Sequence, residues 1–246
     1  MGNYQLTYKP FGESAILIEW PQIISKEILN DIRVFVAKIE SKNSENILEL
    51  NFIYCSLLII YNSKNNCFNE IKNTLISLYE YDNEVIVTAK SEKILWHIPV
   101  CYDEKFGIDL SYLSSEKKLS VEKIISLHCS VDYTVYGIGF LPGFLYLGGL
   151  SDKLYFPRRN SPRLNVPKGA VAIGGNQTGI YPQSSPGGWH IIGNTPISLF
   201  DVKKETPCVI TPGDEIRFKE ITKEEYEVIK IAQKQGSYEL KRVLHG

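Results

Sequence analysis

Between Tyr133 and Phe218, glycines and prolines divide the sequence into short apolar segments, and this punctuation limits what this part of the chain can fold into. Both residue types destabilise the interior of a helix, so long helices are disfavoured here. Many short strands joined by turns are instead typical of a β-barrel or a β-sandwich. The segments that predict strands are YTVYGIGF, KLYF, GAVAIGG, GGWHIIG, ISLF and EIRF.

The first part of the chain alternates between strand-like and helix-like patterns, which indicates a small α/β sandwich. Ser25 is placed to cap a helix whose apolar residues recur on one face as far as Ile39. The apolar run in the second half of 47–61 predicts a buried strand. The other predicted elements are strands at 14–20 and 84–89 and a helix at 68–78.

Polarity changes over residues 89–96, and we place a domain boundary there. The prediction is an N-terminal α/β sandwich domain at 1–90 and a β-barrel domain at 91–246, so that the fold class is α+β. The sequence predicts two helices in the second domain. Ser120 caps the first of them, and Thr222 with Glu225 forms a capping box that starts the second.

Composition excludes several classes of protein. The formal net charge of the 246 residues is −1, so the chain offers no overall electrostatic attraction to nucleic acid or to an anionic membrane. No apolar stretch is long enough to span a membrane, and the N-terminus lacks the pattern of a secretory signal. The five cysteines and four histidines are scattered, without the spacing of metal ligands. We therefore expect a cytoplasmic protein with no metal site of its own.

Two glycine-rich loops resemble nucleotide-binding motifs but lack their chemistry. In the loop 137–143 the third glycine comes one residue too late for a dinucleotide fingerprint, and Pro142 stands where a helix has to begin. The segment GGNQTG lacks the lysine and the hydroxyl residue of a phosphate loop. No G-x-S-x-G motif is present. Ser184 and Ser185 lack a base placed by the sequence, so we do not expect either to be a nucleophile.

The segment PQSSPGGWHIIGNTP restrains its backbone with prolines and glycines around a single Trp-His pair. In a strand, Trp189 and His190 point to opposite sides. By its size and apolar area, Trp189 is the better candidate for the barrel core. His190 is then expected to face a groove or a partner, either as an acid-base group or as a surface residue.

Four long motifs in this order resemble the KipI family, also called allophanate hydrolase subunit 1 or the B-type subunit of 5-oxoprolinase. The motifs are IGFLPGFLYLGGL, PRRNSPRLNVPKGAVAIGGNQTGIYP, SPGGWHIIGNTP and PGDEIRF. A weaker similarity covers YKPFGESAILIEW and CSLLIIY in the first domain. The family usually has arginine in the place of Asn194, and asparagine cannot supply the charge of a guanidinium.

The resemblance implies a cyclophilin-like β-barrel after the small α/β domain. It also implies a subunit of an ATP-dependent 5-oxoprolinase that works with a C-type subunit (allophanate hydrolase subunit 2) and a third protein. ATP with Mg²⁺ is then expected in the assembled complex, with no cofactor bound tightly by this chain alone. The alternatives are a KipI-type inhibitor of a sporulation histidine kinase, a carboxyltransferase-type component related to urea carboxylase and, by fold analogy only, a prolyl isomerase.

Opening a lactam requires cationic groups for the substrate carboxylate and donors for the developing oxyanion. The densest cationic stretch holds Arg158, Arg159, Arg163 and Lys168, and the alternative is an ordinary solvated loop. Of these, the three arginines are the candidate ligands for substrate or phosphate. The polar residues beside the following glycines are candidate ligands for substrate or phosphate, or are simply turn residues. These are Gln177, Thr178, Tyr181 and Gln183. His190 is the candidate catalytic residue.

Overall fold

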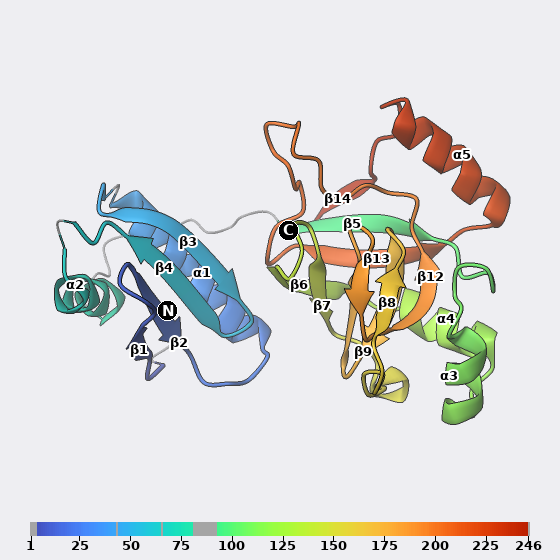
Figure 1. Ribbon diagram of the computed structural model, residues 1–246, viewed down its shortest axis with the longest axis horizontal. Helices are drawn as coiled ribbons and strands as arrows, with labels where there is room; N and C mark the ends of the chain where they lie inside the picture. Colours follow the sequence, from blue (N-terminus) through green and yellow to red (C-terminus); the bar gives the residue numbers. More distant parts are fainter. Residues whose placement is uncertain (1–3, 43, 65, 81–92, 246) are drawn as a thin grey trace. The chain divides into compact units, whose positions relative to one another are not determined.

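A computed structural model describes residues 4–42, 44–64, 66–80 and 93–245. It divides into two compact units, residues 1–91 and 92–246, which are taken separately below (Figure 1). The predicted strand at 84–89 and the first half of the predicted boundary segment, 89–92, lie outside the described residues. Among the described residues, none of the helices has the length and apolar character needed to cross a bilayer.

The first unit is a two-layer α/β sandwich, as the sequence predicts. Its four strands form an antiparallel sheet in the order β1-β2-β4-β3, and one face of this sheet packs against both helices. The shared core includes Ile16, Ile18, Leu57 and Ile59 from the strands and Ile32, Phe35, Ile71 and Leu75 from the helices. The elements are β1 (Thr7–Pro10), β2 (Ala15–Glu19), α1 (Lys26–Ser41), β3 (Ile47–Ile53), β4 (Ser56–Tyr61) and α2 (Phe68–Glu80).

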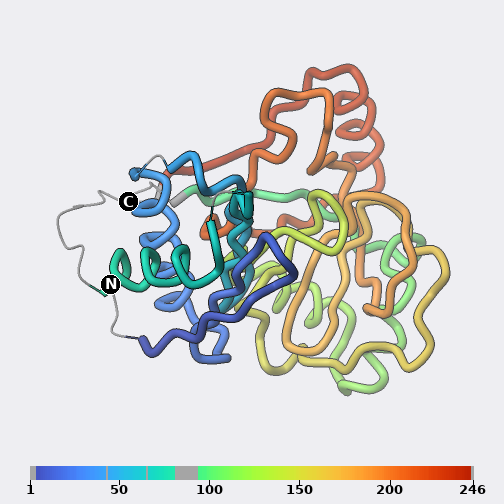
Figure 2. Tube along the Cα trace, turned by 60° about the vertical axis from the view of Figure 1, so that its left-hand side comes forward, coloured from blue at the N-terminus to red at the C-terminus, as the bar shows by residue number. Residues whose placement is uncertain are grey.

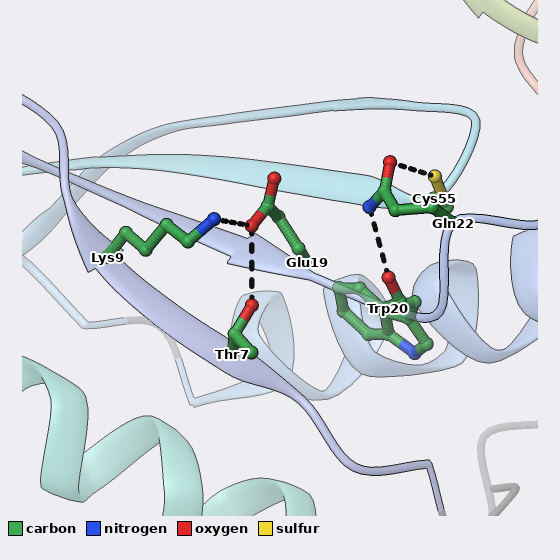
Figure 3. Close-up of polar contacts among 6 residues, drawn as sticks. All are labelled: Thr7, Lys9, Glu19, Trp20, Gln22 and Cys55. Atoms are coloured by element: carbon green, nitrogen blue, oxygen red, sulfur yellow. Dashed lines mark hydrogen bonds and ion pairs between the residues drawn. The ribbon is translucent and has the colours of Figure 1, made fainter.

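Polar side chains connect the Glu19 end of β2 to neighbouring segments (Figure 3). Lys9 on β1 forms an ion pair with Glu19 at the end of β2. Beyond that end, the Gln22 amide donates to the carbonyl of Trp20 at 3.1 Å and accepts from the Cys55 thiol at 3.4 Å. Partly exposed contacts of this kind contribute little to stability, so burial of the apolar face holds this unit together.

The second unit is built on an eight-stranded sheet in the order β12-β9-β10-β7-β6-β13-β5-β14. Of its described strand pairs, β13–β5 alone is parallel. A separate pair, β8 and β11, forms a two-stranded sheet. The strands are β5 (Lys93–Val100), β6 (Tyr133–Ile138), β7 (Leu145–Gly148), β8 (Arg163–Val166), β9 (Ala170–Gly174), β10 (Gln177–Ile180), β11 (Ser185–Gly187), β12 (His190–Asn194), β13 (Glu215–Glu220) and β14 (Arg242–His245). The helices are α3 (Leu110–Lys117), α4 (Val121–Cys129) and α5 (Lys223–Lys234), with a 3₁₀ turn at Asp152–Leu154.

The large sheet bends back on itself without becoming a continuously paired barrel. Figure 1 shows β5 and β13 running across the direction of β9. One bridge joins the two ends of the bend, because Cys101, just after β5, and Asn194 of β12 exchange backbone hydrogen bonds of 2.9 and 3.0 Å. The α+β class is thus confirmed. In place of the predicted closed barrel, the structure has a curved sheet whose β5 and β12 are joined by this bridge.

Local signals place the helix starts correctly. The hydroxyl groups of Ser25 and Ser120 accept from backbone N–H groups three residues ahead. Thr222 and Glu225 form the predicted capping box of α5. Buried residues of the bent sheet and of α3 and α4 form one core, which includes Trp96, Ile98, Tyr133, Ile173 and Phe218.

Candidate functional site

A groove on the second unit gathers several of the residues that the sequence singles out. It encloses about 360 Å³ and takes Arg158, Arg159 and Tyr181 from the predicted set. Its other lining residues are Phe140, Phe144, Tyr146, Pro162, Pro186, Gly187, Gly188 and Trp189. Concave sites lined by aromatic side chains and a few charged groups are the usual form of small-molecule sites.

Glycines let the aromatic rings of this groove lie close against the backbone. A Cβ on Gly174 would lie 2.6 Å from atoms of the Trp189 ring, and one on Gly187 would lie 2.5 Å from the Tyr181 hydroxyl oxygen. Phe144 meets the indole edge-on, with 5.6 Å between the ring centroids. The glycines of the two motifs therefore set the position of the aromatic floor.

Arg158 brings a positive charge to this floor. Its guanidinium carbon lies 5.6 Å from the centroid of the Trp189 ring, within the range of a cation–π contact. The side chain is exposed, and within the described part of the chain Arg158 has no carboxylate partner. Its charge is therefore free to meet an anion or an acidic partner in the groove.

A buried carboxylate, Asp109, holds the other two arginines. Asp109 precedes α3 and is only 4% exposed. The Nη2 of Arg163 donates to its Oδ1 at 2.6 Å, and the backbone N–H of Ile191 donates to its Oδ2 at 2.7 Å. The Nη1 of Arg159 lies 3.7 Å from Oδ1. One negative charge thus faces two positive charges, and the cluster keeps a net positive charge.

Three polar atoms of this cluster are buried without a hydrogen-bond partner among the described residues. They are Nε of Arg159, Nη1 of Arg163 and Nδ1 of His190. Buried donors and acceptors are normally paired, so unpaired ones call for an explanation. A bound carboxylate would accept from both guanidinium groups through charge-assisted hydrogen bonds. The cluster therefore has unused donors of the kind that an anion needs, with an imidazole beside them.

His190 begins β12 and is almost completely covered. Its ring stacks on Tyr112 at a centroid distance of 5.7 Å and meets Phe156 edge-on at 4.8 Å. Burial lowers the pKa of His190, the charge of Asp109 raises it, and the charge of Arg159 lowers it again. The net effect is a lowered pKa, so the imidazole is neutral at neutral pH and able to accept a proton.

The expected arrangement of the Trp-His pair needs a correction. The two rings do point to opposite sides, but both are buried. His190 pairs across the sheet with Ile173 of the main core, whereas Trp189 belongs to a smaller cluster with Phe144 and Tyr181 that lines the groove. The tryptophan therefore faces the groove, and Tyr112 and Phe156 cover the histidine from the other side.

The remaining predicted ligands lie apart from the arginines. Thr178 is fully buried, and its hydroxyl donates to the carbonyl of Ala172 and accepts from Nε2 of His128. Burial lowers the pKa of His128 to about 3, so this buried chain of hydrogen bonds is neutral. Gln177 is buried in β10. Gln183 is exposed and does not line the groove.

Asn194, where the resembling family has arginine, is committed to the fold. It is 5% exposed. Its Nδ2 donates to the carbonyl of Lys168 at 2.9 Å, and its Oδ1 accepts from the Tyr226 hydroxyl at 2.8 Å. Asn194 therefore links α5 to β12 and donates no hydrogen bond to the cluster of Asp109, Arg159 and Arg163.

Comparison with known proteins gives a consistent family. Residues 6–210 match the family model described as carboxyltransferase domain, subdomain C and D. The B-type subunit of the 5-oxoprolinase of Bacillus subtilis is 32% identical over 93% of this chain and 97% of its own length. The corresponding 5-oxoprolinase subunit of Haemophilus influenzae is 37% identical over 85% of this chain and 95% of its own length.

Solved structures agree with the fold. The crystal structure of TTHA0988 is 31% identical with a TM-score of 0.73, and the match covers 84% of this chain and 40% of that one. The urea amidolyase of Kluyveromyces lactis is 19% identical with a TM-score of 0.80, over 98% of this chain and 16% of that one. The present chain thus spans only a minor part of each of these longer proteins.

Proposed function

The chain belongs to the family of carboxyltransferase domains, subdomain C and D, and we propose that it is the B-type subunit of a 5-oxoprolinase, which opens the ring of 5-oxo-L-proline to give L-glutamate. Two relatives named as this subunit match most of the chain. Their name implies a complex of several subunits, and we propose a C-type subunit and a third protein as the partners. All five cysteines are unpaired, which suits a reducing compartment, and we propose that the subunit acts in the cytoplasm.

The observation that carries this proposal is the pair of guanidinium groups with unused buried donors beside an aromatic groove. 5-Oxoproline is a small flat lactam that carries one carboxylate. In the proposal, Arg159 and Arg163 hold that carboxylate through their unpaired N–H groups. The Trp189 ring offers the lactam a flat apolar surface. The neutral His190 lies on the other side of β12, next to Asp109, Arg159 and Arg163, and we propose that it accepts a proton from that side of the cluster.

The groove does not fit Mg²⁺ and ATP. The described residues hold no group of three or more His, Cys, Asp or Glu side chains that could bind a metal ion. The glycine loop at 174–179 carries no lysine, and the carboxylate of the cluster, Asp109, is already occupied by Arg163 and a backbone amide. We therefore assign the nucleotide chemistry to other parts of the assembled complex and derive no step through it here.

An exposed aromatic residue with a strained backbone supports the proposal that a partner protein binds at the rim of the groove. Phe140 is 63% exposed and has a φ of +64°, a conformation that residues other than glycine seldom adopt. Exposed aromatic side chains are typical anchors of protein interfaces. The same anchor would also serve a kinase-inhibiting role, so the identity of the partner has to come from experiment.

We expect the isolated chain to release no glutamate from 5-oxoproline and ATP, because the described residues of the groove supply neither a nucleophile nor a nucleotide site. Glutamate should form once the C-type subunit and the third protein are added. The measurement is glutamate release by the chain alone, by the partners alone and by the full mixture. Turnover by the pure chain would refute the subunit role, and an inactive full mixture would refute the 5-oxoprolinase assignment.

The urea amidolyase relatives favour a second candidate, a carboxyltransferase-type component. A subunit of that kind would transfer a carboxyl group to urea or a similar amide rather than open a lactam. Purification of the chain from its native cell separates the candidates. A C-type subunit with lactam hydrolysis supports 5-oxoprolinase, a urea carboxylase partner supports carboxyl transfer, and a histidine kinase supports the inhibitor.

The pH dependence of the reconstituted enzyme should report His190. A general base works in its neutral form, and the folded pKa of His190 lies below its usual value of about 6.5. The rate should therefore be flat through neutral pH and fall only at more acidic pH. His190→Gln should remove this acidic limb, whereas His97→Gln, which changes a histidine on β5 with other charged neighbours, should keep it. An acidic limb that survives His190→Gln would exclude His190 as the base.

A further inference from the structure

The second unit contains another cavity, separate from the groove, and its walls are rich in lysine. It encloses about 730 Å³ between α5 and the segment that follows β12. Figure 2 shows α5, in red, beside this orange segment. Among the described residues that line the cavity, Asp201 is the only carboxylate and four are lysines: Lys168, Lys204, Lys230 and Lys234.

Most of this positive charge is not neutralised. Lys230 lies 3.4 Å from Glu227, and Lys168 donates to the Ser198 hydroxyl. Within the described residues, Lys204 and Lys234 have no carboxylate partner. Asp201 accepts the backbone N–H of Lys203, so its carboxylate helps to shape the local turn. The cavity therefore carries an excess of positive charge in a chain whose formal net charge is −1.

The lysines come from three separate parts of the fold. Lys230 and Lys234 lie near the C-terminal end of α5, where lysines also serve to offset the helix dipole. That explanation does not apply to Lys168, in the turn before β9, or to Lys204, in the segment after β12. One helix and two loop segments thus place lysines around one space. An ordinary solvent-exposed helix face would explain only the two lysines of α5.

The wall of the cavity between these lysines is firmly held. Thr195 and Tyr226 are buried, and the Tyr226 hydroxyl donates to Asn194 at the end of β12. The backbone N–H of Thr195 donates to the carbonyl of Gly169, next to Lys168. The volume lies within the range of small-molecule sites. The cavity is therefore a built feature of the fold rather than a chance gap between flexible loops.

We propose that this cavity binds a small phosphorylated molecule, with its phosphoryl oxygens held by Lys168, Lys204 and Lys234. Lysine is a common phosphate ligand, acting as a mobile point charge, and a phosphoryl group carries up to two negative charges at neutral pH. Several ammonium groups around one space therefore match the concentrated charge of a phosphoryl group better than they match the single charge of a carboxylate ligand. This site does not depend on the 5-oxoprolinase assignment, since its lining residues differ from those of the groove that holds Arg158 and Arg159.

The test is calorimetric titration of the intact chain with inorganic pyrophosphate and with ADP, in the presence of a metal chelator. We expect saturable binding of at least one probe. Lys204→Ala and Lys234→Ala should each weaken it about tenfold, the scale of one charge-assisted hydrogen bond. Neither side chain forms an ion pair with the described residues, so both variants should unfold like the unaltered protein. The matched control is Lys123→Ala, an exposed lysine on α4 outside the cavity.

Three results would overturn the proposal. One is the absence of saturable binding by both probes. Another is loss of binding in Arg159→Ala with normal binding in Lys204→Ala and Lys234→Ala, because phosphate would then occupy the groove that Arg158 and Arg159 line. The last is equal competition by citrate, which would show a site for polycarboxylates instead of phosphoryl groups.

Discussion

Asp109→Asn is expected to lower the free energy of unfolding of the second unit by about 3–5 kcal/mol, the usual cost of removing one partner from a buried ion pair. The amide would leave the guanidinium groups of Arg159 and Arg163 without a counter-charge, and it would present N–H donors to them. Both arginines keep some contact with water, with side chains 30% and 22% exposed, so the lower end of this range is expected. Urea denaturation followed by circular dichroism measures the loss.

A local measurement can separate this effect from general destabilisation. Asp109 accepts the backbone N–H of Ile191, so hydrogen exchange at Ile191 should speed up more than exchange elsewhere in β12. Removing one positive charge should also restore part of the stability. The double variant Asp109→Asn with Arg163→Gln is therefore expected to be more stable than the sum of the two single changes. Strict additivity would show that the Asp109–Arg163 contact contributes nothing.

Asp109 also marks the limit of what the sequence could reveal about the site. The three arginines are visible because they stand together in one motif. The sequence did not predict α3, so Asp109 did not stand out even as a helix cap. In the structure Asp109 is the residue before α3, yet its side chain makes no capping bond and instead meets Arg163, 54 residues further along. Such a pairing depends on the tertiary fold, so no local sequence pattern predicts it.

The fold shows the same division between local and long-range information. Caps at Ser25, Ser120 and Thr222 involve residues within three positions of each other, so the sequence located them. The turn between β3 and β4 was missed, because Tyr54 takes a φ of +54° where a glycine or asparagine would have been the signal. The bridge between Cys101 and Asn194 joins residues far apart in sequence, so short sequence patterns could not predict it.

Orientation of the Trp-His pair was only half predictable for a related reason. Alternation along a strand places the two rings on opposite sides, but which side becomes the core depends on what covers each side. Here α3 supplies Tyr112 above His190, while the glycines of β9 and β10 make room for the indole. The size of tryptophan alone did not decide its place.

Trp189→Ala is expected to lower the free energy of unfolding of the second unit by about 3–5 kcal/mol, as for other truncations of large buried rings. The ring is 5% exposed and packs on Phe144, Tyr146 and the backbone of Gly174. Activity of the reconstituted complex should fall further than stability alone explains, because the groove loses its floor. Trp189→Phe keeps an aromatic surface and should be affected less in both respects.

Gly174 offers a direct test of that packing. Alone, Gly174→Ala should cost about 1–3 kcal/mol, because its Cβ would lie 2.6 Å from the indole and the ring would have to move. In the Trp189→Ala background the same methyl group would enter the space that the ring has left, so it should cost little or add stability. The two changes should therefore couple strongly in a double-mutant cycle read by urea denaturation. If Gly174→Ala costs the same with and without Trp189, the ring does not lie over this glycine, and the aromatic floor of the groove is built differently.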